Sequence, residues 1–144
     1  MLLTIYTDGA SRSNPGESAS GFQILDENSR QLLEKAFYNG IRTNNEAEYI
    51  AIIAALEAAG SLYGFENDVR IFSDSELVVK QITGAYKVKE AKLKAPNSKA
   101  RALAKRFSSC ILRNVPREDR HISQVDRHLN ALLDDMAKKV YKAD

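Results

Sequence analysis

The chain has one cysteine and no tryptophan among its 144 residues. A single thiol, Cys110, excludes an internal disulfide and any metal site built from a cysteine cluster, and we expect it to be a small, buried strand residue. No apolar run approaches the roughly 18 residues that a membrane-spanning helix needs. We therefore expect a globular protein without a membrane partner.

No linker, repeat or low-complexity segment divides the chain. Apolar residues make up 44% and charged residues 28% of it, which is typical of one domain with one core. We expect a single domain over residues 1–144 and a monomer. Met1–Thr4 lead directly into a predicted strand without the basic segment and cleavage site of a secretory signal, so the expected location is cytoplasmic.

The charge is unevenly distributed, although the net charge is only +2. The segment from Lys80 to Arg117 holds eleven basic residues and one acid, Glu90, whereas the rest of the chain holds ten basic and eighteen acidic residues. A solvated basic surface would explain this pattern. A concentrated basic segment beside an acidic remainder fits better with a bound polyanion, and we favour a nucleic acid.

Apolar patterning and turn signals predict the element order βββαβααβα. We expect strands over residues 2–7, 21–25, 32–38, 69–72 and 110–115, with residues 11–20 forming a turn, and helices over 44–62, 75–82, 97–108 and 123–141. Asn44 or Asn45 is the expected cap of the first helix. The short early connections predict three antiparallel strands, within an α/β fold whose mixed sheet is flanked by helices.

Two aspartates occupy equivalent places in this scheme, because Asp8 and Asp74 each follow an apolar strand. Ligands of such sheets bind beyond the carboxyl ends of parallel strands, so parallel neighbours would bring the two carboxylates together. Alone, each could simply open a turn or cap a helix. Clustered carboxylates with no cysteine among them are hard oxygen ligands, which favours Mg²⁺ or Mn²⁺ and, beside a basic face, two-metal hydrolysis of a phosphodiester.

Four short motifs resemble those of type 1 ribonucleases H, and they occur in the order found in that family. They are Thr7-Asp8-Gly9-Ala10 with Asn14-Pro15-Gly16, Thr43-Asn44-Asn45-Glu46-Ala47-Glu48, Ser73-Asp74-Ser75, and Val115-Pro116-Arg117-Glu118 before the last helix. The resemblance implies a five-stranded mixed sheet of the ribonuclease H type, with three antiparallel and then parallel strands. The implied enzyme is an endonuclease that hydrolyses the RNA strand of RNA–DNA hybrids.

The resemblance also implies which acids hold two Mg²⁺ or Mn²⁺ ions. Asp8 and Asp74 match the first and third motifs, and the family spacing selects Glu48. Helical geometry alone does not choose between Glu48 and Glu46; the latter would then be an acid that the helix dipole favours.

The fourth carboxylate must come from the last helix, where Asp126 and Asp134 compete. The apolar positions of this helix share one face, and Asp126 lies near its edge whereas Asp134 points away from it; these apolar positions are Val125, Leu129, Leu132, Leu133, Met136 and Val140. The segment from Val125 to Leu133 also resembles the family pattern. We choose Asp126, with Asp134 as the runner-up; if Ser123 caps the helix, Asp126 could instead be only a capping-box acid.

Many members of the family carry a mobile histidine in the loop before this helix, and its role there is to help proton transfer and product release. Here His121 could take that role, Arg117 could substitute for it, or His121 could be an exposed loop residue without function. With no tryptophan, the basic segment resembles the branch that lacks a tryptophan-rich basic protrusion, so its residues could line the DNA strand or simply form a solvated helix.

The implied products are 5′-phosphate and 3′-hydroxyl ends. Ribose 2′-hydroxyls would be read near Gly9, Asn14 and Asn45, and Thr43 resembles a residue that binds a DNA phosphate. The alternative interpretations are a turn former for Asn14 and a helix start for Thr43 and Asn45. Two other functions stay open, a hybrid-binding module with weak catalysis and a related nuclease that also acts on double-stranded RNA.

Overall fold

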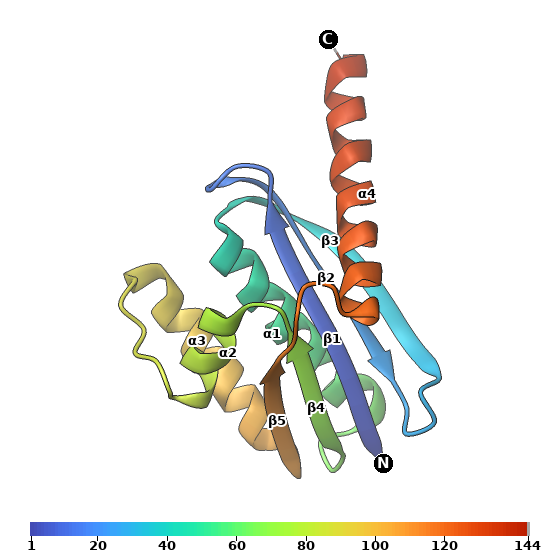
Figure 1. Cartoon of the computed structure of the whole chain (residues 1–144), viewed down its shortest axis with the longest axis vertical. Helices are drawn as coiled ribbons and strands as arrows, with labels where there is room; N and C mark the ends of the chain where they lie inside the picture. Colours follow the sequence, from blue (N-terminus) through green and yellow to red (C-terminus); the bar gives the residue numbers. More distant parts are fainter. Residues whose placement is uncertain (144) are drawn as a thin grey trace.

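A computed structural model describes the backbone of residues 1–143 and the side chains of residues 1–139 (Figure 1). Its sheet has the strand order β3-β2-β1-β4-β5, where β1–β2 and β2–β3 are antiparallel and β1–β4 and β4–β5 are parallel. The strands are β1 (Leu2–Ser11), β2 (Gly16–Leu25), β3 (Gln31–Arg42), β4 (Asp68–Ser73) and β5 (Ser109–Asn114). This confirms the predicted mixed sheet and the predicted order of elements.

Helices cover both faces of the sheet. In Figure 1 α1, α2 and α3 lie behind the sheet and α4 lies in front of it, extending beyond the strands towards the C-terminus. The helices are α1 (Asn44–Tyr63), α2 (Glu76–Thr83), α3 (Ala91–Arg106) and α4 (Arg120–Ala143). Within the described part of the chain, none of them combines the length and the apolar character that crossing a membrane requires.

Most of the apolar core lies between the sheet and α1. Ile5 and Ile71 on neighbouring strands pack with Ile52 and Leu56 of α1, and all four side chains are fully buried. Leu93 joins α3 to this core. Beneath α4 a smaller cluster contains Ala19, Val125, Leu129 and Leu133. The side chain of Val140, predicted to belong to the same face of α4, lies outside the described residues.

The first hairpin is longer than the sequence indicated. The predicted turn over residues 11–20 is wrong for its second half, because the register of β1 and β2 continues through Ala10↔Ala19 to Ser11↔Ser18. The first half of β2 consists of small side chains, which give no apolar pattern in the sequence, although Ser18 and Ala19 are buried there. The extended hairpin places the turn at residues 12–15 between the start of α1 and the middle of α4.

Three helix starts also differ from the prediction. Thr43, rather than Asn44 or Asn45, caps α1, because its side chain accepts from the amide of Glu46 while Glu46 accepts from the amide of Thr43. The third helix begins at Ala91 rather than 97, since Leu93 is buried before Pro96 and the missing amide of Pro96 does not end the helix.

The last helix begins at Arg120 rather than at Ser123. The Asp119 carboxylate accepts from the amides of His121 (2.9 Å) and Ile122 (3.1 Å), which is the geometry of a cap. Asp126 therefore lies beyond the first turn of α4, and the capping-box alternative for it was wrong.

Candidate active site

Three carboxylates meet where the parallel pairing of β1 with β4 ends, with Asp74 directly after β4 and Asp8 inside β1, which continues to Ser11. The prediction that Asp8 follows the end of its strand was therefore wrong. Thr7 of β1 pairs in parallel register with Ser73 of β4, so the residues that follow them, Asp8 and Asp74, are neighbours. Glu48 reaches the same point from the second turn of α1. Each acid offers an oxygen, and these three oxygens lie within 4.8 Å of one another.

Glu48 is held by two donors that belong to the central strands. The backbone amide of Gly9 donates to its Oε1, and the Ser73 hydroxyl donates to its Oε2 at 3.1 Å. A Cβ at Gly9 would lie 2.4 Å from the carbonyl carbon of Ala47, so only glycine permits α1 to approach β1 this closely. Ser73 was not among the predicted site residues, and its only signal was its place before Asp74.

Burial and mutual repulsion raise the pKa values of these acids. For Asp8, loss of hydration is the main cause of the raised pKa, followed by the charges of Glu48 and Asp74. For Glu48, burial and the charge of Asp74 raise the pKa, against the donors from Gly9 and Ser73. Burial also raises the pKa of Asp74, although the nearby Arg117 guanidinium opposes that shift. A cation bound among the carboxylates would offset both their mutual repulsion and their loss of hydration.

The donor set fits a hard divalent metal ion. All three groups are carboxylates, and Asp8 and Glu48 are buried, with exposed fractions of 5% and 6%. Mg²⁺ and Mn²⁺ prefer such oxygen ligands. Asp8, Glu48 and Asp74 could therefore bind a metal ion.

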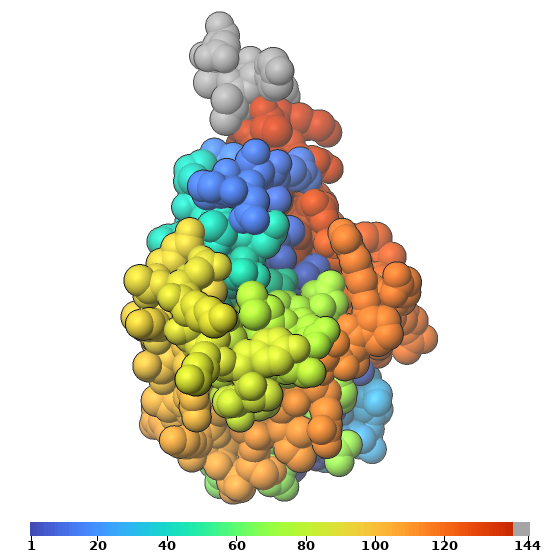
Figure 2. Space-filling model, turned by 60° about the vertical axis from the view of Figure 1, so that its left-hand side comes forward, coloured from blue at the N-terminus to red at the C-terminus, as the bar shows by residue number. Residues whose placement is uncertain are grey.

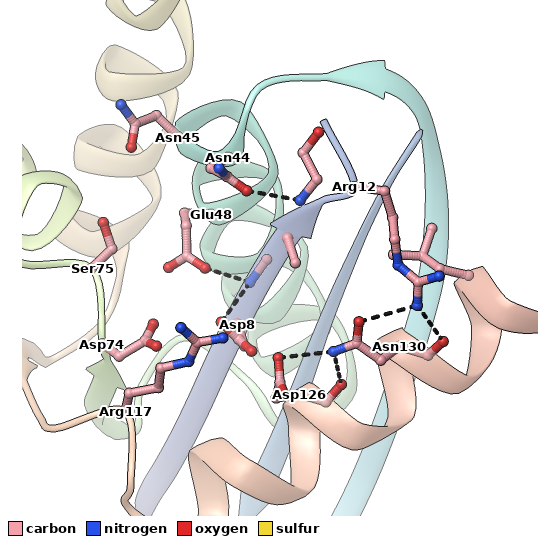
Figure 3. Close-up of a pocket in the computed structure, with 14 residues that line it drawn as sticks. Asp8, Arg12, Asn44, Asn45, Glu48, Asp74, Ser75, Arg117, Asp126 and Asn130 are labelled. Atoms are coloured by element: carbon pink, nitrogen blue, oxygen red, sulfur yellow. Dashed lines mark hydrogen bonds between the residues drawn. The ribbon is translucent and has the colours of Figure 1, made fainter. Parts of the chain in front are cut away.

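Asp126 of α4 lines the same cleft, from the opposite side (Figure 3). It is not among the three acids within 4.8 Å of one another, but its charge raises the pKa of both Asp8 and Asp74. The runner-up, Asp134, does not line the cleft; its side chain is 61% exposed and pairs with Arg12 at 2.8 Å. Glu46 belongs instead to the capping box of α1, where its side chain accepts a hydrogen bond from the backbone amide of Thr43.

The rim of the cleft contains several residues proposed to contact substrate. Gly9, Asn45 and Arg117 line it directly. Asn14 and Thr43 adjoin it, because the Asn14 side chain accepts from the amide of Asn44 at 3.0 Å and Thr43 caps the same helix. The structure adds polar residues that were not predicted as site residues, namely Ser11, Arg12, Asn44, Ser75 and Asn130.

His121 occupies a different place from the one expected of a mobile loop histidine. It belongs to α4, its ring stacks on Tyr6 with centroids 4.3 Å apart, and its Nδ1 lies 3.3 Å from Oε1 of Gln23. The expectation of a loop position was wrong, because Asp119 starts the helix before it. Of the two candidates, Arg117 is the one that lines the cleft.

The connection between α2 and α3 carries part of the basic segment at the surface. Figure 2 shows this connection (yellow-green to yellow) exposed below the turn between β1 and β2 (blue). A shallow hollow there is lined by Leu77, Tyr86, Lys87 and Lys89, together with Gln81 and Glu90. The cations and the exposed aromatic ring are groups that bind nucleic acid strands.

Comparison with known proteins points to one family. The "Reverse transcriptase-like" family model matches residues 6–125. Ribonuclease HI of Halobacterium salinarum is 40% identical over 130 residues, which is 90% of this chain and 63% of that protein. The bifunctional protein Rv2228c of Mycobacterium tuberculosis is 36% identical over 96% of this chain and 37% of its own length. The chain thus spans less than two thirds of the length of these relatives.

Solved structures agree with the sequence matches. The crystal structure of RNase H1 from H. salinarum has a TM-score of 0.87 at 38% identity, covering 94% of this chain and 99% of that one. LC11-RNase H1, crystallised in complex with an RNA/DNA hybrid, has a TM-score of 0.80 at 37% identity, covering 91% and 99%. Each of these two likenesses covers more than nine-tenths of this chain.

Proposed function

Because this chain belongs to the ribonuclease H family, we propose that it is an endoribonuclease that hydrolyses the RNA strand of RNA–DNA hybrids. The observation that carries the proposal is the cluster of Asp8, Glu48 and Asp74 where the parallel pairing of β1 with β4 ends. A related structure, LC11-RNase H1, was solved with an RNA/DNA hybrid, and this supports the same substrate class here.

Asp8, Glu48, Asp74 and Asp126 are the residues that would hold two divalent metal ions. When bound, such ions activate water for attack on the scissile phosphate and stabilise the leaving 3′ oxygen, giving 5′-phosphate and 3′-hydroxyl ends. The chain prepares the site by fixing Glu48 between the Gly9 amide and the Ser73 hydroxyl. These contacts orient the carboxylate before any substrate binds, so little reorganisation is needed.

Arg117 lines the cleft, and its guanidinium lies near enough to Asp74 for its charge to oppose the raised pKa of that carboxyl. Its guanidinium offers a planar set of donors that matches phosphate oxygens. We assign to Arg117 the help with product release that a loop histidine gives in many relatives, because a guanidinium binds phosphate but does not transfer a proton. We assign no such role to His121, whose ring is packed on Tyr6.

Substrate recognition would combine the cleft rim with the basic segment. Gly9, Asn14 and Asn45 stand near the start of α1, where ribose 2′-hydroxyls could be read. Thr43 caps the same helix end, which attracts phosphates through its free amides and dipole. Lys87 and Lys89 would track the DNA strand, so binding should weaken steeply as salt is raised.

The test compares labelled RNA–DNA hybrid, double-stranded RNA and DNA, each with Mg²⁺ or Mn²⁺. We expect preferential cleavage of the hybrid. Asp8→Asn should reduce the rate by more than about 100-fold while hybrid binding remains, since even outer partners of metal ligands are worth roughly 10–100-fold. Asp135→Asn, which changes an exposed carboxylate of α4, is the matched control and should cleave normally.

Each other outcome contradicts a distinct part of the proposal. Unchanged cutting by Asp8→Asn would contradict the metal-site assignment. Equal cleavage of double-stranded RNA would contradict hybrid specificity. Hybrid binding without cleavage at any metal concentration would identify a binding module instead of an enzyme.

A further inference from the structure

The turn between β1 and β2 is fastened to both helices that carry acids of the site. On one side, the amide of Ser11 donates to Oδ1 of Asn44 at 2.8 Å, and the amide of Asn44 donates to Oδ1 of Asn14 at 3.0 Å. On the other side, Arg12 donates to the carbonyl and the side chain of Asn130 in α4. One short segment therefore spans the cleft between the start of α1 and the middle of α4.

The Asn130 side chain continues this connection to Asp126. Its Nδ2 donates to Oδ1 of Asp126 at 3.0 Å and to the backbone carbonyl of Asp126 at 2.9 Å. Its Oδ1 accepts from the Arg12 guanidinium at 3.2 Å. Because arginine can only donate, the amide must turn its oxygen to Arg12 and its nitrogen to Asp126 (Figure 3).

Asp126 needs such support more than the other acids do. Asp8 lies within the paired strand β1, Asp74 directly follows the paired strand β4, and Glu48 is held by Gly9 and Ser73. Asp126 projects from α4, which is docked by a small apolar cluster. Among the described residues, Asn130 is the side chain that donates to its carboxylate.

We propose that Asn130, oriented by Arg12, is the positioning residue that holds one oxygen of Asp126 and leaves the other free for a metal ion. The inference rests on the proposed function, because Asp126 is a ligand only if the cleft binds metal. An outer partner that fixes a carboxylate typically affects metal affinity by about 10–100-fold. Arg12 acts one step further away, through the orientation of the amide.

The ion pair of Arg12 with Asp134 supplies the control. It joins the same arginine to the same helix at 2.8 Å, but its carboxylate is 61% exposed and faces away from the cleft. If Arg12 merely fastened the turn to α4, the loss of Asp134 and the loss of Asn130 would have similar consequences. If Asn130 positions Asp126, the loss of Asn130 should weaken metal binding, whereas the loss of Asp134 should not.

The experiment is a Mg²⁺ titration of the full chain without nucleic acid, followed by the backbone amide signals in two-dimensional NMR. In Asn130→Ala, signals around Asp126 should need about tenfold more Mg²⁺ for half-saturation. Signals around Asp8 should titrate nearly as in the unaltered chain. Asp134→Asn should leave both sets unchanged. Arg12→Ala should also raise the Mg²⁺ concentration at which the signals around Asp126 are half-saturated. Arg12→Lys, which restores a donor, should bring this concentration most of the way back to that of the unaltered chain.

Cleavage of the hybrid gives a second measurement. For Asn130→Ala the metal concentration at half-maximal rate should rise about tenfold, and the rate should approach that of the unaltered chain at saturating metal. Equal metal dependence of Asn130→Ala and the unaltered chain overturns the inference, as does an equal effect of Asp134→Asn. If the unaltered chain binds Mg²⁺ as described but does not cleave the hybrid, the proposed function fails and the positioning role stands.

Discussion

The two faces of the sheet differ in what fills them. Behind the sheet, α1 and α3 bury a continuous apolar core that includes Ile5, Ile52 and Leu56. In front, α4 rests on a small apolar cluster and on polar groups, such as the buried Gln23, which contacts Gln124 at 3.0 Å. His128 of α4 also pairs with Glu34 of β3. The rear face supplies most of the buried apolar area, and therefore most of the hydrophobic stabilisation.

The carboxylate cleft lies where these two regions meet. Glu48 comes from the rear helix, Asp126 from the front helix, and Asp8 and Asp74 from the strands between them. Asp8, Glu48 and Asp74 are placed by the strands and the rear helix, whereas the position of Asp126 depends on how α4 packs on the sheet. We therefore expect changes behind the sheet to affect mainly stability, and changes beneath α4 to affect both stability and the position of Asp126.

The largest expected effect comes from cavities made on the two faces. Ile52→Ala behind the sheet should lower the free energy of unfolding by about 3–5 kcal/mol, because α1 is enclosed and cannot relax into the space. Leu129→Ala beneath α4 should cost about 2–3 kcal/mol, because the apolar cluster there is smaller and the lost side chain has fewer apolar neighbours. Urea unfolding in excess Mg²⁺ measures both.

The metal requirement of cleavage should change more in Leu129→Ala than in Ile52→Ala, which is the opposite of the order expected for stability. Leu129 lies in the same stretch of α4 as Asp126, so its truncation should raise the Mg²⁺ concentration needed for half-maximal cleavage, whereas Ile52→Ala should leave it unchanged in the folded fraction. A larger metal requirement for Ile52→Ala would show that the rear core also sets the position of the fourth acid.

A smaller effect is expected from pH in the metal-free chain. Burial raises the pKa of Glu48 from 4.5 to about 7, and it also raises that of Asp8. The pKa values of these two acids are thus higher in the folded chain than in the unfolded chain. Their contribution to stability is complete at a pH below the unfolded-state pKa values, and it is lost as the pH rises through the folded-state pKa values. In EDTA the free energy of unfolding should therefore fall by roughly 1–3 kcal/mol between pH 5 and pH 8.

Two comparisons check that this pH dependence arises in the cleft. Asp8→Asn removes a buried carboxyl that the folded, metal-free chain must keep protonated at pH 8 although it would ionise in the unfolded chain. The variant should therefore be more stable at pH 8 and flatten the slope, whereas Asp135→Asn should keep the slope. Mg²⁺ should also flatten it, because a bound cation favours the ionised acids. A slope that survives both Asp8→Asn and Mg²⁺ would place its source elsewhere.

The sequence was sufficient for the strand-end acids and the order of elements. Asp8 and Asp74 each follow an apolar run of the sequence, and the parallel pairing of these two runs brings the acids together although β1 continues past Asp8 to Ser11. Glu48 required the family spacing, because helical periodicity treats Glu46 and Glu48 alike. The capping box of Thr43 and Glu46 gives Glu46 a separate structural role.

The contacts around the acids could not be predicted, because they join residues that are distant in sequence. Arg12 and Asn130 are separated by 118 positions, and nothing in either segment indicates the other. The start of α4 was misplaced because Ser123 and Asp119 are both acceptable caps, and the sequence alone does not choose between them. That choice moved His121 from a loop into a helix.

The smallest expected effect concerns Thr43, at the border between the two regions. Its side chain accepts from the amide of Glu46 at 3.2 Å, so Thr43→Ala should lower the free energy of unfolding by about 1 kcal/mol. Thermal unfolding in Mg²⁺ measures the change, and Thr43→Ser should restore the stability.

Thr43→Asp separates the cap from the proposed phosphate contact at the same residue. Aspartate caps helices as well as serine does and its charge favours a helix N-terminus, so unfolding should stay close to that of the unaltered chain. A negative charge facing a DNA phosphate should nevertheless weaken hybrid binding, most clearly at low salt where screening is least. Unchanged affinity of Thr43→Asp for the hybrid would confine Thr43 to capping α1, and the phosphate contact would then have to be sought at Asn45 or Lys87.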